Sequence, residues 1–94
     1  MIGRTLRNRY QIIKLLGQGG FGDTYLAKDL DLPGQPPCVV KHLKPKDPNP
    51  ALLPIARRLF NKEAEVLYKL GNHSNQIPKL FAHFEQEGEF YLVQ

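Results

Sequence analysis

The sequence has little sulfur, no tryptophan and no long apolar run. Its 94 residues include one cysteine, Cys38, and one methionine. A single cysteine cannot form an internal disulfide, and this fits a reducing compartment. No apolar run is long enough for a membrane-spanning helix or for the hydrophobic core of a signal peptide. We therefore expect a cytoplasmic protein without a membrane-spanning segment.

The composition is that of an ordinary folded domain. Hydrophobic residues make up 41% and charged residues 23% of the chain, which argues against disorder. The 13 Lys and Arg residues exceed the 9 Asp and Glu residues, so the formal net charge is +4. This charge permits binding to phosphate groups without demanding it. The length allows one domain, or one lobe of a larger domain.

Residue patterns predict an α+β fold, with a five-stranded antiparallel sheet and one main helix. β-branched and aromatic residues indicate strands at 9–16, 24–28, 38–43, 80–86 and 89–94. Apolar residues at helical spacing indicate a helix over about 52–70, which Gly71 would end. Residues 44–50 would form a loop, and Glu87-Gly88 is typical of a hairpin turn. Residues 1–8, with Arg4 and Arg7, would form a basic, solvated tail before a domain at 9–94.

A glycine cluster between the first two predicted strands indicates a phosphate site. Gly17, Gly19 and Gly22 satisfy G-x-G-x-x-G, which alone is a weak signal. A dinucleotide-binding fold would need a helix here, but the residues after Asp23 favour a strand. A Walker loop would need a lysine where Asp23 stands. A strand–loop–strand hairpin that closes over phosphates fits best, with a plain tight hairpin as the alternative.

A lysine and a glutamate stand at positions where apolar residues surround them. Val39, Lys41 and Leu43 share one face of their strand. The predicted helix carries an apolar stripe made of Ala56, Leu59, Phe60, Val66, Leu67 and Leu70. Glu63 lies at the centre of that stripe, where a carboxylate is costly unless a cation pairs with it. We infer a Lys41–Glu63 ion pair; the alternatives are a lysine that reaches solvent and a glutamate at the stripe's edge.

Together these motifs resemble the N-terminal lobe of a eukaryotic-type serine/threonine protein kinase, in a style similar to bacterial and cyanobacterial members. Residues 17–24 resemble the kinase glycine-rich loop. Cys38-Val39-Val40-Lys41 stands where the family has Val-Ala-Ile-Lys, and Glu63 matches the glutamate of the regulatory helix. The resemblance covers roughly residues 9–94.

The resemblance implies an ATP site and assigns roles within it. The implied ATP contacts are Leu16, Gly17, Gln18, Gly19, Gly20, Phe21, Gly22, Thr24, Val39, Lys41 and Gln94. Lys41 and Glu63 would act as the catalytic pair that positions the ATP phosphates, and Gln94 would be the gatekeeper residue. Thr24 and Val39 replace the family's valine and alanine, so we expect a more polar and tighter pocket roof.

The resemblance also implies what the 94 residues do not contain. In the family, the catalytic base and the Mg²⁺ ligands belong to the C-terminal lobe. We therefore expect no phosphoryl transfer by this chain alone. We also expect an apolar underside that includes parts of Phe90, Leu92 and the helix end, which the missing C-terminal lobe or a protein partner would cover.

Two other functions are compatible with parts of the sequence. The chain could be a non-catalytic half-kinase that binds a partner, or a small basic domain that binds nucleic acid through a platform of Phe81, Phe84, Phe90 and Tyr91. The nucleic-acid hypothesis leaves the glycine cluster without a role, so no nucleic acid is expected. Cys38 and His42 would lie about 13 Å apart on one strand, too far to share an ion, so no metal site is expected either.

Overall fold

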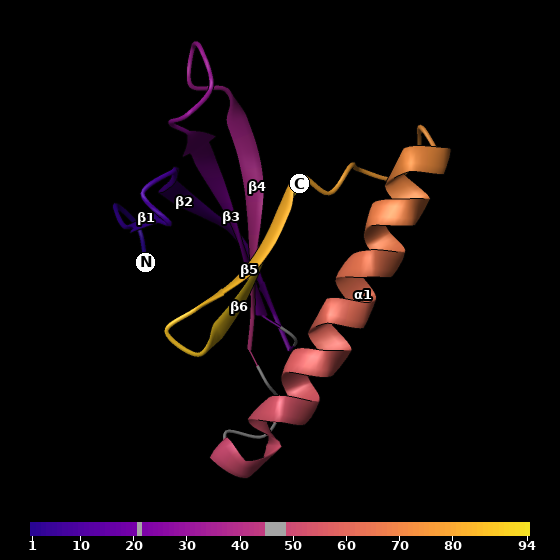
Figure 1. Cartoon of the computed structure of the whole chain (residues 1–94). Coiled ribbons are helices and arrows are strands. Elements are labelled where there is room, and N and C mark those ends of the chain that lie inside the picture. Colours follow the sequence, from indigo (N-terminus) through magenta and orange to yellow (C-terminus); the bar gives the residue numbers. More distant parts are fainter. Residues whose placement is uncertain (21, 45–48) are drawn as a thin grey trace.

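The computed structural model describes residues 1–20, 22–44 and 49–94, and it consists of one sheet and one long helix. The strands are β1 (Thr5–Leu6), β2 (Tyr10–Gly19), β3 (Gly22–Asp29), β4 (Pro37–Leu43), β5 (Ala82–Gln86) and β6 (Glu89–Val93). A short 3-10 turn, η1 (Pro50–Leu52), leads into α1 (Leu53–His73). The strand order is β1-β2-β3-β4-β6-β5, and every neighbouring pair is antiparallel. Figure 1 shows α1 beside the end of the sheet that β5 and β6 form.

The predicted α+β fold with an antiparallel sheet and one main helix is confirmed, but the sheet has six strands rather than five. The additional strand is β1, in which Thr5 pairs with Gln11 and Leu6 pairs with Tyr10. Three residues lie between β1 and β2; Arg7 and Asn8 have φ values of 52° and 55°, and the Arg9 amide donates to the Leu6 carbonyl oxygen at 2.9 Å, which closes the turn. A strand of two residues shows no alternation that a sequence pattern can reveal.

Residues 1–8 therefore do not form the solvated tail that their basic residues indicated. Leu6 is fully buried, at 0% exposure. Arg4 Nη2 lies 2.8 Å from Glu87 Oε2, and the Arg7 amide donates to Gln86 Oε1 at 3.0 Å. The Arg7 guanidinium also lies 5.0 Å from the ring centroid of Phe84. The basic residues thus attach this segment to the β5–β6 hairpin.

The larger hydrophobic cluster covers the face of the sheet that Leu6 joins. Side chains along β3 and β4 alternate between buried and half-buried positions, as a two-faced sheet requires. The buried members are Leu6, Tyr10, Ile12, Tyr25, Ala27, Cys38, Val40, Phe84, Tyr91 and Val93. Burial in this cluster raises the pKa of the Cys38 thiol, so this free cysteine is a packing residue.

A second, smaller cluster joins α1 to the other face of the sheet. Phe60 and Ala64 of α1 pack with Phe90 and Leu92 of β6, and the rings of Phe60 and Phe90 are 4.9 Å apart. Phe90 and Leu92 are thus buried and do not belong to the exposed underside that we expected, whereas Tyr68 and Leu70 near the end of α1 are 55% and 46% exposed. Phe81 is instead 67% exposed.

The helix begins where predicted but does not end at Gly71. Asn49 caps η1 by accepting a hydrogen bond from the amide of Ala51 at 3.0 Å. Gly71 is buried inside α1, which continues to His73. A Cβ at Gly71 would lie only 3.0 Å from the Pro78 carbonyl oxygen. This glycine therefore allows the returning chain to approach the helix closely rather than ending the helix.

Candidate nucleotide site

The strand register aligns several of the predicted site residues in one row across the sheet. Gly17 of β2 pairs with Thr24 of β3, and Thr24 pairs with Lys41 of β4. Lys41 in turn pairs with Leu92 of β6. Directly paired residues in antiparallel strands point to the same face. Thr24 and Lys41 therefore share the face opposite the larger hydrophobic cluster, and both side chains are half-buried.

Val39 and Gln94 lie together next to this row. The Val39 amide donates to the Gln94 carbonyl oxygen at 2.8 Å, and the Gln94 amide donates to the Val39 carbonyl oxygen at 2.9 Å. Gln94 also extends its side-chain amide to the Pro78 carbonyl oxygen at 3.4 Å. The backbone thus brings Val39 and Gln94 together with Thr24 and Lys41 along neighbouring strands.

The glycine cluster forms the tip of the β2–β3 hairpin. Gly19 pairs with Gly22 across the tip, and β2 has a register shift between Leu15 and Gly17, which leaves Leu16 at an irregular position. Leu16 is half exposed, at 50%. A Cβ at Gly17 or Gly20 would meet nothing within 4 Å, so the tip has open space beside it. Phe21, which we assigned to the ATP contacts, lies outside the described residues.

Gly22 is the glycine at which two constraints coincide. Its φ is +147°, a conformation that side-chain-bearing residues rarely adopt. A Cβ there would also collide with the carbonyl oxygen of His42 and lie 3.0 Å from the Cα of Leu43. Gly22 therefore lets the glycine hairpin pack directly against the end of the strand that carries Lys41.

Asp23, the next residue, carries a charge that is nearly removed from solvent. Its side chain is 10% exposed and lies 3.1 Å from the Lys44 ammonium, just beyond β4. The Tyr25 hydroxyl donates to the same carboxylate at 3.4 Å. The hydrogen bond to Asp23 raises the pKa of Lys44, so Lys44 stays charged. The pair between Asp23 and Lys44 was not predicted from the sequence, where Asp23 stood out only as a mismatch to the Walker loop; the antiparallel register of the two strands could have indicated it.

A buried histidine lies next to Asp23, on the same face of the sheet. His42 pairs with Asp23 across the strands and stacks on Tyr91 with ring centroids 4.8 Å apart. Its Nε2 atom is 3.1 Å from Glu89 Oε2 but makes no hydrogen bond of good geometry. Glu89 instead accepts from the Tyr91 hydroxyl at 2.9 Å, while burial raises the pKa of Tyr91 to about 12. These groups form a polar cluster behind the glycine hairpin.

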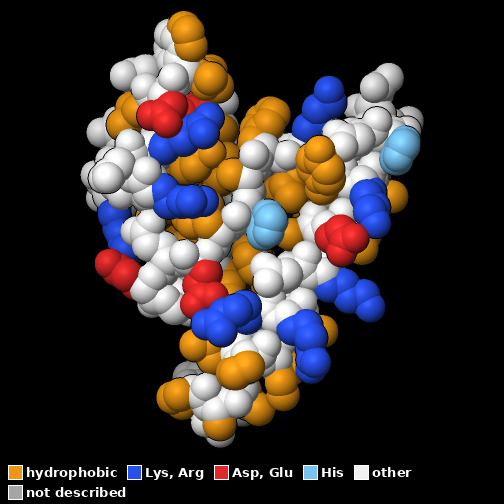
Figure 2. Space-filling model, in the orientation of Figure 1, with side chains coloured by type: hydrophobic (Ala, Val, Ile, Leu, Met, Phe, Trp, Pro, Cys, Tyr) orange, Lys and Arg blue, Asp and Glu red, His pale blue; other side chains and the backbone are white. Residues whose placement is uncertain are grey.

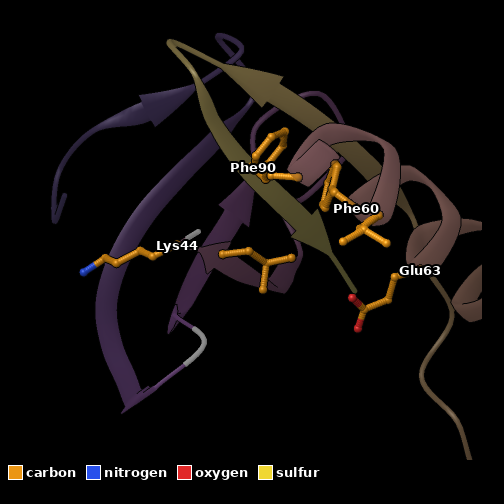
Figure 3. Close-up of a pocket in the computed structure, with 7 residues that line it drawn as sticks. Lys44, Phe60, Glu63 and Phe90 are labelled. Carbon is orange, nitrogen blue, oxygen red and sulfur yellow. The ribbon is translucent and has the colours of Figure 1, made fainter. Parts of the chain in front are cut away.

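The inferred Lys41–Glu63 ion pair is not formed in this structure. The ion pairs among the described residues include neither side chain, and Glu63 is exposed. Glu63 lines a cavity of about 380 Å³ between α1 and the sheet, together with Leu43, Lys44 and Phe90. Figure 3 shows Glu63 and Lys44 at opposite ends of this cavity, with the Lys44 ammonium pointing away from it.

The helix is rotated relative to the predicted orientation, which explains the missing pair: of the predicted stripe, Ala56, Phe60 and Leu67 pack against the sheet and the other three residues do not. The α1 residues that pack in the smaller cluster are Leu53, Ala56, Phe60, Ala64 and Leu67, and Gly71, on the same line of the helix, is buried against Pro78 and Lys79. Leu59, Val66 and Leu70, which we placed on the buried stripe, are 61%, 49% and 46% exposed. Glu63 follows this exposed line along α1, so it is not centred on the buried face. On the other side of α1, a bidentate pair joins Arg57 to Glu85 of β5 at 2.6 Å and 3.0 Å.

Within the described part of the chain, no group of three or more His, Cys, Asp or Glu side chains could hold a metal ion. In residues 1–20, 22–44 and 49–94, no helix combines the length and the apolar character needed to cross a membrane.

Comparisons with known proteins identify the family. The chain is 52% identical over 88 residues to serine/threonine-protein kinase D of Synechocystis sp., an alignment that covers 93% of this chain and 17% of that protein. It is 47% identical to serine/threonine-protein kinase PknA of Nostoc sp. over 95% of this chain and 16% of the relative. No model of a known protein family matches the sequence.

Solved structures agree with these relatives. The kinase domain of Mycobacterium tuberculosis PknI superposes with a TM-score of 0.72 and 25% identity, over 99% of this chain and 34% of that domain. In sequence and in fold the chain therefore matches the N-terminal lobe of a serine/threonine protein kinase domain. It spans less than a fifth of the length of the two bacterial relatives described above.

Proposed function

We propose that this lobe binds ATP on the sheet face that carries Thr24 and Lys41, as the nucleotide-binding part of a serine/threonine protein kinase. The observation that carries the proposal is the register row from Gly17 through Thr24 to Lys41. The row brings a lysine beneath a glycine hairpin, and phosphoryl transfer needs this combination of positioning and positive charge.

The contacts proposed for ATP divide between its two ends. The glycine hairpin, with Gln18 and Phe21, would cover the phosphates, and Lys41 would bind them. The adenine would lie against Leu16, Thr24 and Val39, with Gln94 at the rear of the pocket. The Thr24 hydroxyl would make the roof of this pocket more polar than a valine would.

We also propose that Lys41 and Glu63 pair when α1 moves toward the sheet. Both side chains lack an ion-pair partner among the described residues, and Glu63 lines the cavity that separates α1 from the strands. A double-mutant cycle with Lys41→Met and Glu63→Gln measures their coupling. We expect additive effects on the stability of this chain without nucleotide.

In the complete enzyme, residues outside these 94 would supply the catalytic base and the ligands of the Mg²⁺ that accompanies ATP. We therefore propose that the 94-residue polypeptide alone does not transfer phosphate to protein serine or threonine. The kinase would act in the cytoplasm, where Cys38 stays reduced. A phosphotransfer assay with labelled ATP and a general protein substrate should stay at background, and turnover above background would overturn this part of the proposal.

ATP binding is tested by isothermal titration and by thermal shift. Lys41→Met should remove most of the stabilisation that ATP provides. Lys28→Met is the matched control, because Lys28 lies on β3, on the same sheet face as Thr24, but at the far end of the strand and exposed. Equal loss in both variants, or no loss in either, would overturn the proposed site.

A second candidate function is the binding of a protein partner through α1. Leu59, Val66 and Leu70 form an exposed apolar line along the helix, and lines of this kind mark protein interfaces. Figure 2 shows hydrophobic side chains at the boundary between sheet and helix, and Lys and Arg side chains over the helix. A C-terminal kinase lobe or another protein would cover this line. Sedimentation of the chain alone, and of Leu59→Glu as a comparison, would detect self-association through this surface.

A further inference from the structure

We propose that Asp23 and Lys44 are positioning residues that fix the glycine hairpin over the nucleotide phosphates. The inference rests on the proposed ATP site and adds two residues that would not touch ATP. Asp23 points to the face opposite Thr24, because neighbouring residues of a strand point to opposite faces. The pair thus lies on the face opposite the proposed ATP site and would affect ATP binding through the backbone of the hairpin.

The two residues join the tip of one hairpin to the end of the neighbouring strand. Asp23 directly follows Gly22, the last glycine of the cluster, and Lys44 directly follows β4, which carries Lys41. Their side chains meet at 3.1 Å. Since Gly22 pairs with Leu43, the link lies next to the final backbone pairing between these strands. A link at this point sets how far the glycine tip stands from Lys41.

The two side chains differ in exposure, so Asp23 depends on the ion pair more than Lys44 does. The Asp23 carboxylate is nearly buried, at 10% exposure, whereas the Lys44 side chain is 58% exposed. A buried carboxylate needs hydrogen-bond donors, and Tyr25 supplies only a long bond of 3.4 Å. Lys44 is therefore the main partner of Asp23. Without Lys44, the hairpin end would have to move to let Asp23 reach water.

The cavity beside α1 does not offer Lys44 an alternative role as a ligand. Lys44 lines that cavity through its carbon chain, and Figure 3 shows its ammonium directed away from it. The ammonium binds Asp23 on the rear of the sheet instead. Lys44 is thus separated from Lys41, whose side chain lies on the front face.

The test compares ATP with adenosine, which lacks the phosphates that the hairpin would cover. Lys44→Met and Asp23→Asn should weaken ATP binding roughly two- to fivefold and leave adenosine binding unchanged. Lys44→Arg should retain wild-type affinity, because it keeps the charge and the reach. Lys69→Met is the charge-matched control for Lys44→Met, since it breaks an ion pair with Glu65 on α1 and removes one positive charge as well.

A second measurement does not depend on ATP. Amide hydrogen exchange at Gly19 and Gly22 should become faster in Lys44→Met and Asp23→Asn than in Lys69→Met, while exchange in the middle of β3 stays the same. If the wild type binds ATP no better than adenosine, the proposed function fails, and the exchange rates still decide whether the pair fixes the hairpin. If ATP affinity and hairpin exchange both stay at wild-type values in the two variants, the positioning role is wrong.

Discussion

Replacing Gly22 by alanine tests the central geometric feature of the site, the close contact between the glycine hairpin and β4. At φ +147°, a residue with a Cβ is strained by about 1–3 kcal/mol. The Cβ would also meet the His42 carbonyl oxygen and the Cα of Leu43, which are backbone atoms that cannot rotate away. Forcing atoms into such a contact costs about 1–3 kcal/mol more. We therefore expect Gly22→Ala to lower the free energy of unfolding by about 2–6 kcal/mol.

This loss is large for a domain of 94 residues, whose total stability is expected at about 5–14 kcal/mol. The melting temperature should fall by at least about 8 °C. Gly20→Ala is a matched control in the same hairpin, because its Cβ would meet nothing within 4 Å and its φ is not in the glycine-favouring range. We expect Gly20→Ala to change stability by less than about 1 kcal/mol.

Urea unfolding followed by circular dichroism measures both variants against the wild type. The two alanines add the same methyl group within three positions of each other, so a difference between them reports the local geometry. If both variants unfold at the same urea concentration, Gly22 is not wedged against β4, and the arrangement of hairpin and strand described above is wrong.

Three further variants test the rest of the fold. Phe60→Ala should lower the free energy of unfolding in urea by about 3–5 kcal/mol, because Phe60 is buried between α1 and β6. Leu59→Ala, at an exposed position, should change it by less than about 0.5 kcal/mol. Similar losses in both variants would show that the helix face described above is not the one that packs against the sheet. Hydrogen bonds from Arg9 lower the pKa of Asp29, so this carboxylate stabilises the fold above the ordinary aspartate pKa and loses that effect as pH falls through its lowered value. The stability difference between wild type and Asp29→Asn should therefore shrink in urea titrations at progressively lower acidic pH, and a constant difference would contradict the pairing. Gly71→Ala should lower the melting temperature despite alanine's higher helix propensity, because its Cβ would lie 3.0 Å from the Pro78 carbonyl oxygen. A raised melting temperature would show that the segment with Pro78 and Lys79 yields to the added methyl group.

The sheet could be predicted from sequence because its signal is short-range. The strands β2 to β6 alternate or cluster β-branched and aromatic residues, and Glu87 and Gly88 adopt the positive φ values of 55° and 77° that their turn requires. Once the hairpins are recognised, register follows and brings Thr24 beside Lys41. β1 escaped prediction because one buried leucine among basic residues leaves no pattern.

The orientation of α1 could not be predicted because apolar residues occupy more than half of its circumference. One line through Phe60, Ala64 and Gly71 and another through Leu59 and Leu70 both have helical spacing. Counting hydrophobic residues favours a face between the two, on which Glu63 is central. The structure selects the line that contains the small residues Ala64 and Gly71: Ala64 packs against β6, and at Gly71 the returning chain comes so close that a Cβ would lie 3.0 Å from the Pro78 carbonyl oxygen.

Lys41 and Glu63, the two charged residues of the proposed site, are held in place by interactions of different stiffness. Backbone hydrogen bonds between strands fix Lys41 relative to the glycine hairpin, and they allow little adjustment without breaking the ladder. Glu63 is carried by a helix that rests on the sheet through side chains such as Phe60, and side-chain contacts permit small rotations and shifts. An apolar partner that covered Leu59 and Leu70 would bias the orientation of α1, and with it the distance from Glu63 to Lys41. In this lobe the lysine is thus preset by the sheet, while the position of the glutamate depends on what packs against the helix.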